Sequence, residues 1–187
     1  MKKSLLFFTI LCSMFVSTAH AAASLHHRPF AGVTFDESRY QYKTTPSFHD
    51  WNEAVGIFGG YRWTDFGVQA SAQYMRPIHA RSNTTPVTVD VHAYNFALDG
   101  LYFYKLCNRL EWKSLLGLGV MTNHFSVKHY DGLGSATTTG VGARVGTGLQ
   151  YQFTDHFVGE AMVKGQYPGN KAINNVVGVS LGVAYVF

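Results

Sequence analysis

The stretch that decides the fold closes the chain: Val177-Gly178-Val179-Ser180-Leu181-Gly182-Val183-Ala184-Tyr185-Val186-Phe187. Bulky apolar residues occupy every second position from Val177 to Phe187, and the positions between them, from 178 to 184, hold only Gly, Ser and Ala. A period of two is the pattern of a β-strand. A strand of a soluble sandwich turns a polar or charged face to water, so an uncharged strand with one bulky and one small face indicates a strand between lipid and a crowded interior.

The same alternation recurs along the chain with a weaker signal in each segment, as is typical of membrane strands. It predicts seven further strands, at 29–41, 54–63, 66–74, 87–104, 111–121, 140–153 and 157–167. Short polar turns are expected at 64–65, 105–110 and 154–156, and long links at 43–53, 76–86, 122–139 and 168–175. We therefore predict an all-β fold, an eight-stranded antiparallel up-and-down transmembrane β-barrel, with both termini on the short-turn, periplasmic side. The alternative is a soluble antiparallel sandwich with aromatic corners.

Composition agrees with this fold and excludes others. The 187 residues are 47% hydrophobic but only 14% charged, against about 25% in soluble domains. The mean hydropathy is −0.01, which excludes a helical membrane bundle, and the residue usage excludes a coiled coil or a disordered chain.

The one long apolar run lies at the start of the chain. Lys2 and Lys3 precede the apolar segment 5–16, and Ala19-His20-Ala21 then forms a small-x-small cleavage site. This order predicts a secretory signal peptide at 1–21 and an outer membrane β-barrel domain at 22–187; a membrane-anchor helix needs about 20 apolar residues. Without residues 1–21 the formal net charge falls from +4 to +2, so no nucleic-acid partner is expected.

Four segments resemble a known family. The polar, glycine and aromatic positions Ser180, Gly182, Tyr185 and Phe187 resemble the C-terminal assembly signal of bacterial outer-membrane barrels. The segments 59–68, 116–120 and 146–155 resemble the small eight-stranded outer membrane β-barrel group, which includes opacity-type proteins and the N-terminal domain of outer membrane protein A. The resemblance implies a Gram-negative outer membrane location, recognition by the barrel assembly machinery and contact with membrane lipids and lipopolysaccharide. It implies no particular activity.

A barrel of eight strands is just wide enough to be filled by its own side chains. The inward positions of the predicted strands carry several charges, which must be paired because an isolated buried charge costs several kcal/mol. We predict that Glu160 pairs with Arg144 or Lys164 from the neighbouring strands. A packed interior disfavours a diffusion pore, and a narrow gated pore is the alternative.

Function is then expected in the long links, because wall and core are occupied by the barrel itself. Candidate surface residues are Trp51, His79, Arg81, Phe125, Lys128 and Tyr130. The links contain five basic residues (Lys43, Arg76, Arg81, Lys128, Lys171) but only two acidic ones (Asp50, Asp131). Such a rim would attract anionic surfaces. We predict a structural or surface-interaction protein that binds lipopolysaccharide or host surface molecules.

Two sharper chemical hypotheses remain. His124 and Ser126 resemble the His-x-Ser motif of outer-membrane lipid A deacylases, in which His activates a Ser nucleophile. Val127 follows where that family has Asn, and the only nearby acid is Asp131, so we predict no enzyme activity. A zinc or copper site would need His49, His79, His124 and His129 to converge. Their spacing fits no single strand face, and neither a metal nor another cofactor is expected.

Overall fold

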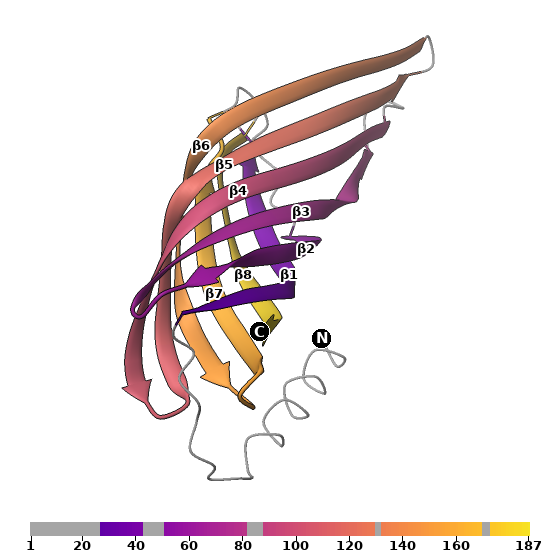
Figure 1. Ribbon diagram of the computed structural model, residues 1–187. Helices are drawn as coiled ribbons and strands as arrows, with labels where there is room; N and C mark the ends of the chain where they lie inside the picture. Colours follow the sequence, from indigo (N-terminus) through magenta and orange to yellow (C-terminus); the bar gives the residue numbers. More distant parts are fainter. Residues whose placement is uncertain (1–26, 43–50, 82–87, 130–131, 170–172) are drawn as a thin grey trace.

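The chain forms one closed sheet of eight antiparallel strands, in the order β1-β2-β3-β4-β5-β6-β7-β8 (Figure 1). The computed structural model describes residues 27–42, 51–81, 88–129, 132–169 and 173–187. The predicted signal peptide 1–21 lies outside these residues. No helix in the described part of the chain is long and apolar enough to cross a membrane. The strands are β1 (Arg28–Tyr42), β2 (Trp51–Arg62), β3 (Phe66–Arg81), β4 (Thr88–Cys107), β5 (Leu110–His129), β6 (Gly132–Gln152), β7 (Phe157–Tyr167) and β8 (Ile173–Val186).

Pairing of the first and last strands closes the barrel. β1 and β8 are antiparallel from Phe30↔Val186 to Tyr42↔Ile173. Two backbone bonds extend the closure at the short-turn end: Phe187 donates to the carbonyl of Pro29 at 3.0 Å, and Val186 donates to that of His156 at 2.7 Å. The β-strand prediction for the terminal segment is therefore confirmed, and the closed barrel leaves no free sheet edge at this seam.

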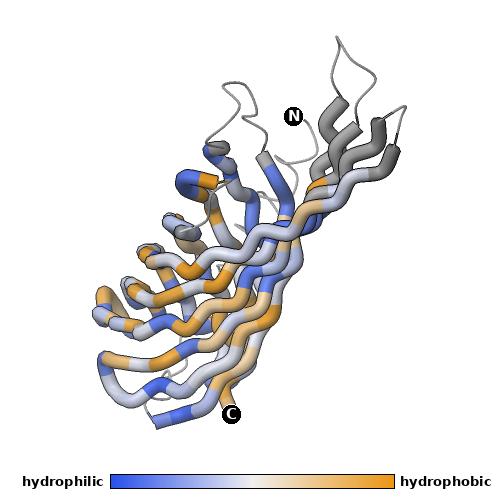
Figure 2. The backbone as a smooth tube through the Cα atoms, turned by 90° about the horizontal axis from the view of Figure 1, so that it is seen from above, coloured by the Kyte–Doolittle hydropathy of each residue, from blue (hydrophilic) through white to orange (hydrophobic). Residues whose placement is uncertain are grey.

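The alternation of residues sorts the two faces of the wall as predicted. The alternate bulky residues from Val177 to Tyr185 of β8 are exposed on the outside, while Ser180 and Ala184 between them are buried. The outward side chains of Ile57, Leu98 and Leu116 are 65%, 65% and 69% exposed. Figure 2 shows hydrophobic and hydrophilic residues alternating along the strands. An outside of this kind is stable only against lipid, because water would have to hydrate every one of these side chains.

Aromatic rings mark both borders of the apolar wall. Near the short turns, ring pairs form between Tyr61 and Trp63 (5.5 Å) and between Phe66 and Tyr102 (5.4 Å). At the opposite border, Tyr74 of β3 stands 5.3 Å from Tyr94 of β4. From Tyr94 to Tyr102 the strand is about 26 Å long at roughly 3.3 Å per residue. Because membrane strands tilt, this length covers less than the full height of an apolar band about 25 Å tall. The aromatic girdle predicted beside the short turns is confirmed, and Tyr74 and Tyr94 define the second border.

Four strands continue beyond the Tyr74–Tyr94 border. We call this part the protruding sheet: residues 76–81 of β3, 88–93 of β4, 123–129 of β5 and 132–138 of β6. It rises past the rest of the barrel in Figure 1. The predicted long links at 76–86 and 122–139 were therefore wrong for most of their length, because β5 and β6 remain paired as far as His129↔Gly132. Outside the lipid both faces of a strand meet water, so the bulky/small alternation stops although the backbone pairing continues.

Leu118 provides a test of the lipid-facing wall. It is 63% exposed and pairs with Leu98 halfway between the two aromatic borders. We expect Leu118→Arg to lower the free energy of unfolding in phospholipid vesicles by about 2–4 kcal/mol, because an arginine at the bilayer midplane carries that cost. The matched control is Leu106→Arg beyond the girdle, where about 0–1 kcal/mol is expected. Urea titrations measure both; equal effects would contradict the assigned membrane level.

Candidate functional site

The lumen is crossed by buried ion pairs between strands that are not neighbours. Lys113 of β5 donates to Glu160 of β7 at 2.6 Å and to Gln69 of β3 at 3.1 Å. The Lys113 side chain is almost fully buried, and its ammonium group lies 5.6–5.9 Å from the ring centres of Phe30, Phe58 and Phe103. A lysine held in this way ties three parts of the wall together across the barrel.

A second pair closes the lumen near the short turns. The guanidinium of Arg62 on β2 forms a two-pronged contact with the Glu111 carboxylate on β5, at 2.6 and 3.0 Å. The same guanidinium lies 4.0 Å above the centre of the Phe103 ring, and Gln150 donates to Glu111 at 3.4 Å. This geometry gives the arginine both of the partners that its flat, delocalised charge prefers, a carboxylate and an aromatic face.

The upper half of the lumen holds two more pairs. Lys164 of β7 donates to Asp36 of β1 at 3.2 Å and to Ser180 of β8 at 2.8 Å. Arg144 of β6 lies 3.7 Å from the buried Asp99 carboxylate of β4 and donates to Ser71 at 3.1 Å. A chain of amides, Gln73, Asn95 and Gln166, extends the network from Asp36 across the barrel.

The predicted partners of Glu160 were wrong, although Arg144, Glu160 and Lys164 each belong to a lumen ion pair. In the β6–β7 register Glu160 faces Gln150, whereas Arg144 faces Gln166, six residues or about 20 Å further along the strand. Lys164 is four residues from Glu160 on the same strand, a separation of about 13 Å. Neither cation is level with Glu160, and Lys113 reaches it across the lumen instead.

Side chains fill the space that these pairs leave. Two apolar clusters pack against the pairs: Tyr40, Ala54, Met75, Ala93, Met121, Ile173 and Val176 towards the protruding sheet, and Leu101, Phe103, Leu115 and Met162 with Phe30 against them at the level of Lys113. Two cavities among the described residues measure about 20 and 30 Å³ and share no lining residue. Each has room for one or two water molecules. The described lumen is a packed core, as predicted, and the charges in it balance at four cations and four anions.

The residues of the predicted assembly signal lie on both faces of β8. Ser180 is buried and accepts the hydrogen bond of Lys164, and a Cβ at Gly182 would stand 2.9 Å from Cγ of Glu160. Tyr185 and Phe187 face outward with their rings 5.1 Å apart. The inward pair therefore makes room for the lumen network, while the outward pair belongs to the aromatic girdle.

Most surface candidates lie on strands rather than in loops. Trp51 is the first residue of β2, His79 and Arg81 are on β3, and Phe125 and Lys128 are on β5. Tyr130 lies outside the described residues, as do His49, Lys43, Asp50, Asp131 and Lys171. The exposed Arg76 of the predicted rim pairs with Glu53 at 2.9 Å, so its charge is partly offset by its neighbour.

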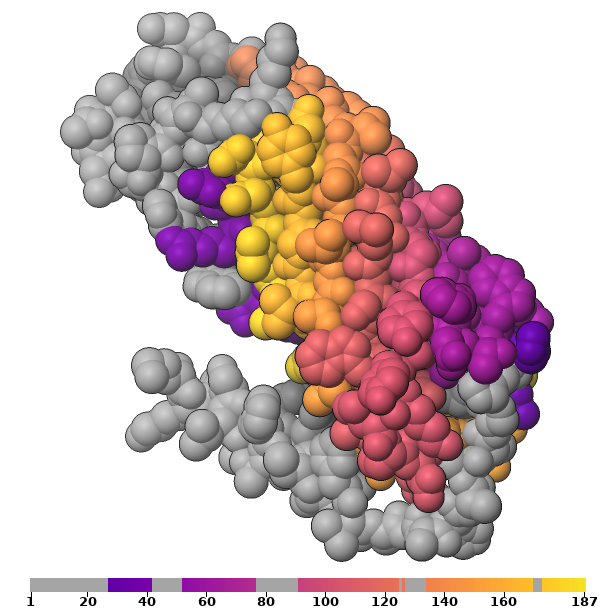
Figure 3. Space-filling view, turned by 90° about the vertical axis from the view of Figure 1, so that its left-hand side faces the viewer, coloured from indigo at the N-terminus to yellow at the C-terminus, as the bar shows by residue number. Residues whose placement is uncertain are grey.

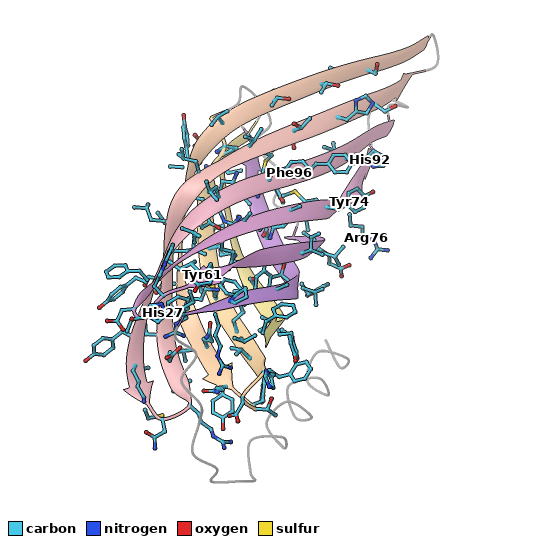
Figure 4. All side chains as sticks on the ribbon, viewed as in Figure 1. His27, Tyr61, Tyr74, Arg76, His92 and Phe96 are labelled. Atoms are coloured by element: carbon cyan, nitrogen blue, oxygen red, sulfur yellow. The ribbon has the colours of Figure 1, made fainter. Side chains whose placement is uncertain are left out.

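His124 and Ser126 occupy one strand, two residues apart. Such residues share a face at about 6.6 Å, and the His124 ring bonds through Nδ1 to Thr137 of β6 at 2.9 Å instead of to Ser126. Its cross-strand neighbour His92, which the sequence did not single out, lies 3.4 Å through Nδ1 from the Tyr74 hydroxyl. Figure 4 shows Tyr74, Arg76 and His92 at the protruding end, with Tyr61 towards the other end. Within the described residues no three His, Cys, Asp or Glu side chains could share a metal ion.

A closed barrel with an apolar outside, two aromatic borders and a filled lumen is an outer-membrane protein by architecture. The sequence matches the family described as "Outer membrane protein beta-barrel domain" over residues 8–187, and the chain belongs to that family. A search of curated proteins finds no match.

Solved structures share the fold at low sequence identity. Ail, the attachment invasion locus protein of Yersinia pestis, superposes with a TM-score of 0.63 at 18% identity, covering 87% of this chain and 99% of Ail. A second Ail structure, with a TM-score of 0.63 at 17% identity over the same shares of the two chains, holds the heparin analogue sucrose octasulfate. Neisserial surface protein A gives a TM-score of 0.65 at 18% identity, covering 85% of this chain and 97% of that one.

Removing one partner of the Lys113–Glu160 pair should lower the free energy of unfolding much more than removing both charges. Lys113→Met leaves a buried carboxylate without its cation, so we expect the free energy of unfolding to fall by about 3–5 kcal/mol. Adding Glu160→Gln should recover most of that loss. Arg76→Met, which breaks the exposed pair with Glu53, should cost at most about 1 kcal/mol. Urea unfolding of the four proteins measures these values; a double variant no more stable than Lys113→Met would contradict the pairing.

The packed lumen also predicts the electrical behaviour of the barrel. Ion pairs and apolar clusters fill the described lumen, and the cavities of about 20 and 30 Å³ between them share no lining residue. We expect near-zero conductance when the purified protein is inserted in a planar bilayer. A steady open state in most insertions would contradict a packed interior and favour the gated-pore hypothesis.

Proposed function

We propose that this protein is a surface-interaction protein of the outer membrane, in which a filled barrel anchors a recognition surface outside the cell. The observation that carries the proposal is the protruding sheet: four strands continue past the Tyr74–Tyr94 border while the lumen below them is filled. The filled lumen supports an anchor rather than a transporter. In this arrangement residues 1–21 serve as the cleaved signal peptide, and both termini lie on the periplasmic side.

The ligand we propose is an anionic surface polymer, such as a sulfated glycan of a host cell. Two basic residues stand in one row of the protruding sheet, because Arg81 of β3 and Lys128 of β5 both pair with Thr88 of β4. Two strand spacings place their Cα atoms about 10 Å apart. In the sequence, Lys43 follows the last residue of β1 and Lys171 precedes β8 by two residues. The complex of Ail with a heparin analogue shows that a barrel of this fold accepts such a ligand.

Retention on immobilised heparin tests this proposal. Replacing Arg81 and Lys128 by Ser should weaken binding about 3- to 10-fold at low ionic strength, because exposed charge contacts are worth about 0.2–1 kcal/mol each. Added salt should reduce the difference as it screens the rim.

The matched control removes two cations from the opposite end, with Lys105→Ser and Arg109→Ser beside the β4–β5 turn. It should be retained like the unmodified protein. Equal loss in both double variants, or retention that salt does not affect, would contradict a binding site on the protruding rim.

A further inference from the structure

One edge of the protruding sheet pairs with no strand among the described residues. Residues 132–138 of β6 in the protruding sheet, and residues 139–140 at its base, pair with β5 on one side, but the ladder with β7 ends at Ala143↔Tyr167. Beyond it the chain leaves at Gly169, which has φ +62° and crowds the carbonyl of Val141. In the described part of the chain, no strand pairs with this stretch of β6. A Cβ at Gly134 would meet nothing within 4 Å, and residues 135–137 are exposed. In Figure 1 this stretch is the outermost ribbon of the protruding sheet.

The opposite edge of the same sheet is blocked. β2 pairs with β3 only up to Ala54↔Met75, so residues 76–81 of β3 form the other edge. That edge carries Pro77, an irregularity between Met75 and Ile78, and the charged residues Arg76 and Arg81. Proline, a bulge and charge are the devices by which proteins prevent edge strands from pairing. β6 has none of the three between 132 and 140, so only its edge can accept another strand.

The open edge is complementary to itself. An antiparallel pair centred on Thr137 would set Thr137 against its copy, Ala136 against Thr138, Ser135 against Thr139 and Gly134 against Gly140. Thr137 then meets Thr137 and Ser135 meets Thr139, which are favourable cross-strand combinations of hydroxyl residues, and the remaining pairs join small residues to Thr138 or to each other. The segment has no charge, so bringing two copies together causes no repulsion.

We propose that two copies of this chain pair through residues 134–140 of β6, as antiparallel strands centred on Thr137. The contact is isologous, and it closes at two copies because the β3 edge is blocked. The two-fold axis of such a pair runs along the sheet normal. Since the barrel wall stands upright in the membrane, this rotation turns one barrel upside down relative to the other. With the protruding sheet outside the cell, as the proposed function has it, the pair therefore joins barrels of two facing membranes.

A single contact of seven residues is weak, because few backbone groups pair and little apolar surface is buried. Many copies in two facing membranes would act together, and linked weak contacts gain strength by effective concentration. We therefore expect self-association to be slight for solubilised protein and strong between membranes that carry many barrels. The first experiment must trap the contact, and the second must measure it in its multivalent form.

Thiol crosslinking tests the register. In a Cys107→Ser background, Thr137→Cys should give a covalent dimer with a crosslinker of about 8 Å span, because facing Cβ atoms lie about 4.5–5.5 Å apart. Ser135→Cys alone should not, because its copy lies four residues or about 14 Å along the strand. A mixture of Ser135→Cys and Thr139→Cys proteins should crosslink, since these positions face each other. No dimer with Thr137→Cys, or as much with Ser135→Cys alone, would overturn the proposal.

Vesicle clustering tests the geometry. Proteoliposomes with the protruding sheets outward should cluster, as measured by light scattering, and Thr137→Lys should abolish clustering by placing like charges at the two-fold centre. The control is Ser126→Lys, which adds the same charge to β5 inside the sheet, opposite Ser135. Clustering that is lost in both variants or in neither would overturn pairing through the β6 edge.

Heparin retention of the same two variants separates this proposal from the proposed function. Both add one positive charge to the protruding sheet, so both should bind heparin alike while only Thr137→Lys loses clustering. If the unmodified protein clusters vesicles but does not bind heparin, self-pairing stands and the glycan ligand is wrong. If it binds heparin but does not cluster vesicles, the glycan ligand stands and self-pairing is wrong.

Discussion

The absence of water in the bilayer is the constraint on which the rest of this structure depends. An unpaired backbone N–H or C=O in lipid costs several kcal/mol, so a sheet that crosses a membrane must close on itself. Here the closure is the β1–β8 ladder. Figure 3 shows β8, β7, β6 and β5 side by side as one wall. Closing eight strands sets a lumen that side chains can fill, and this leaves the two ends of the barrel as the places where function can develop.

The lumen charges have a role that the stability of single pairs does not explain. Replacing a buried ion pair with apolar residues is often neutral or stabilising, so four such pairs are a weak argument for stability. They do determine which face of each strand points inward. A shift of one residue in β5 would turn Lys113 and Glu111 outward and Leu118 into the lumen. Glu160 and Arg62 would then lie in the lumen without their partners, and breaking a buried pair in this way costs about 3–5 kcal/mol. The charges thus exclude shifted registers, which the small, uncharged inner face of β8 would not exclude by itself.

Local pattern was enough to predict the wall but not the contacts across it. Alternation identified the eight strands and their lipid faces because lipid selects every second residue, as in β8 and around Leu98 and Leu116. The partner of Glu160 depends on the register of β5 relative to β7, with β6 between them, which no local pattern encodes. The strand extensions at 76–81, 122–129 and 132–139 were missed for a related reason, since lipid no longer selects residues there. The row formed by Tyr74, His92, His124 and Thr137 became visible only through pairing.

The requirement that every backbone group be paired applies only inside the membrane. Above it, water can satisfy free backbone groups, so β4, β5 and β6 can extend without a closing partner. The two edges created there are treated differently: β3 carries proline, an irregularity and two arginines, whereas β6 keeps nine uncharged residues without proline. An open edge exposes a protein to aggregation, and devices that prevent pairing are cheap in sequence terms. A sheet that blocks one edge and leaves the other open therefore restricts association to a single geometry, which a contact that closes at two copies requires.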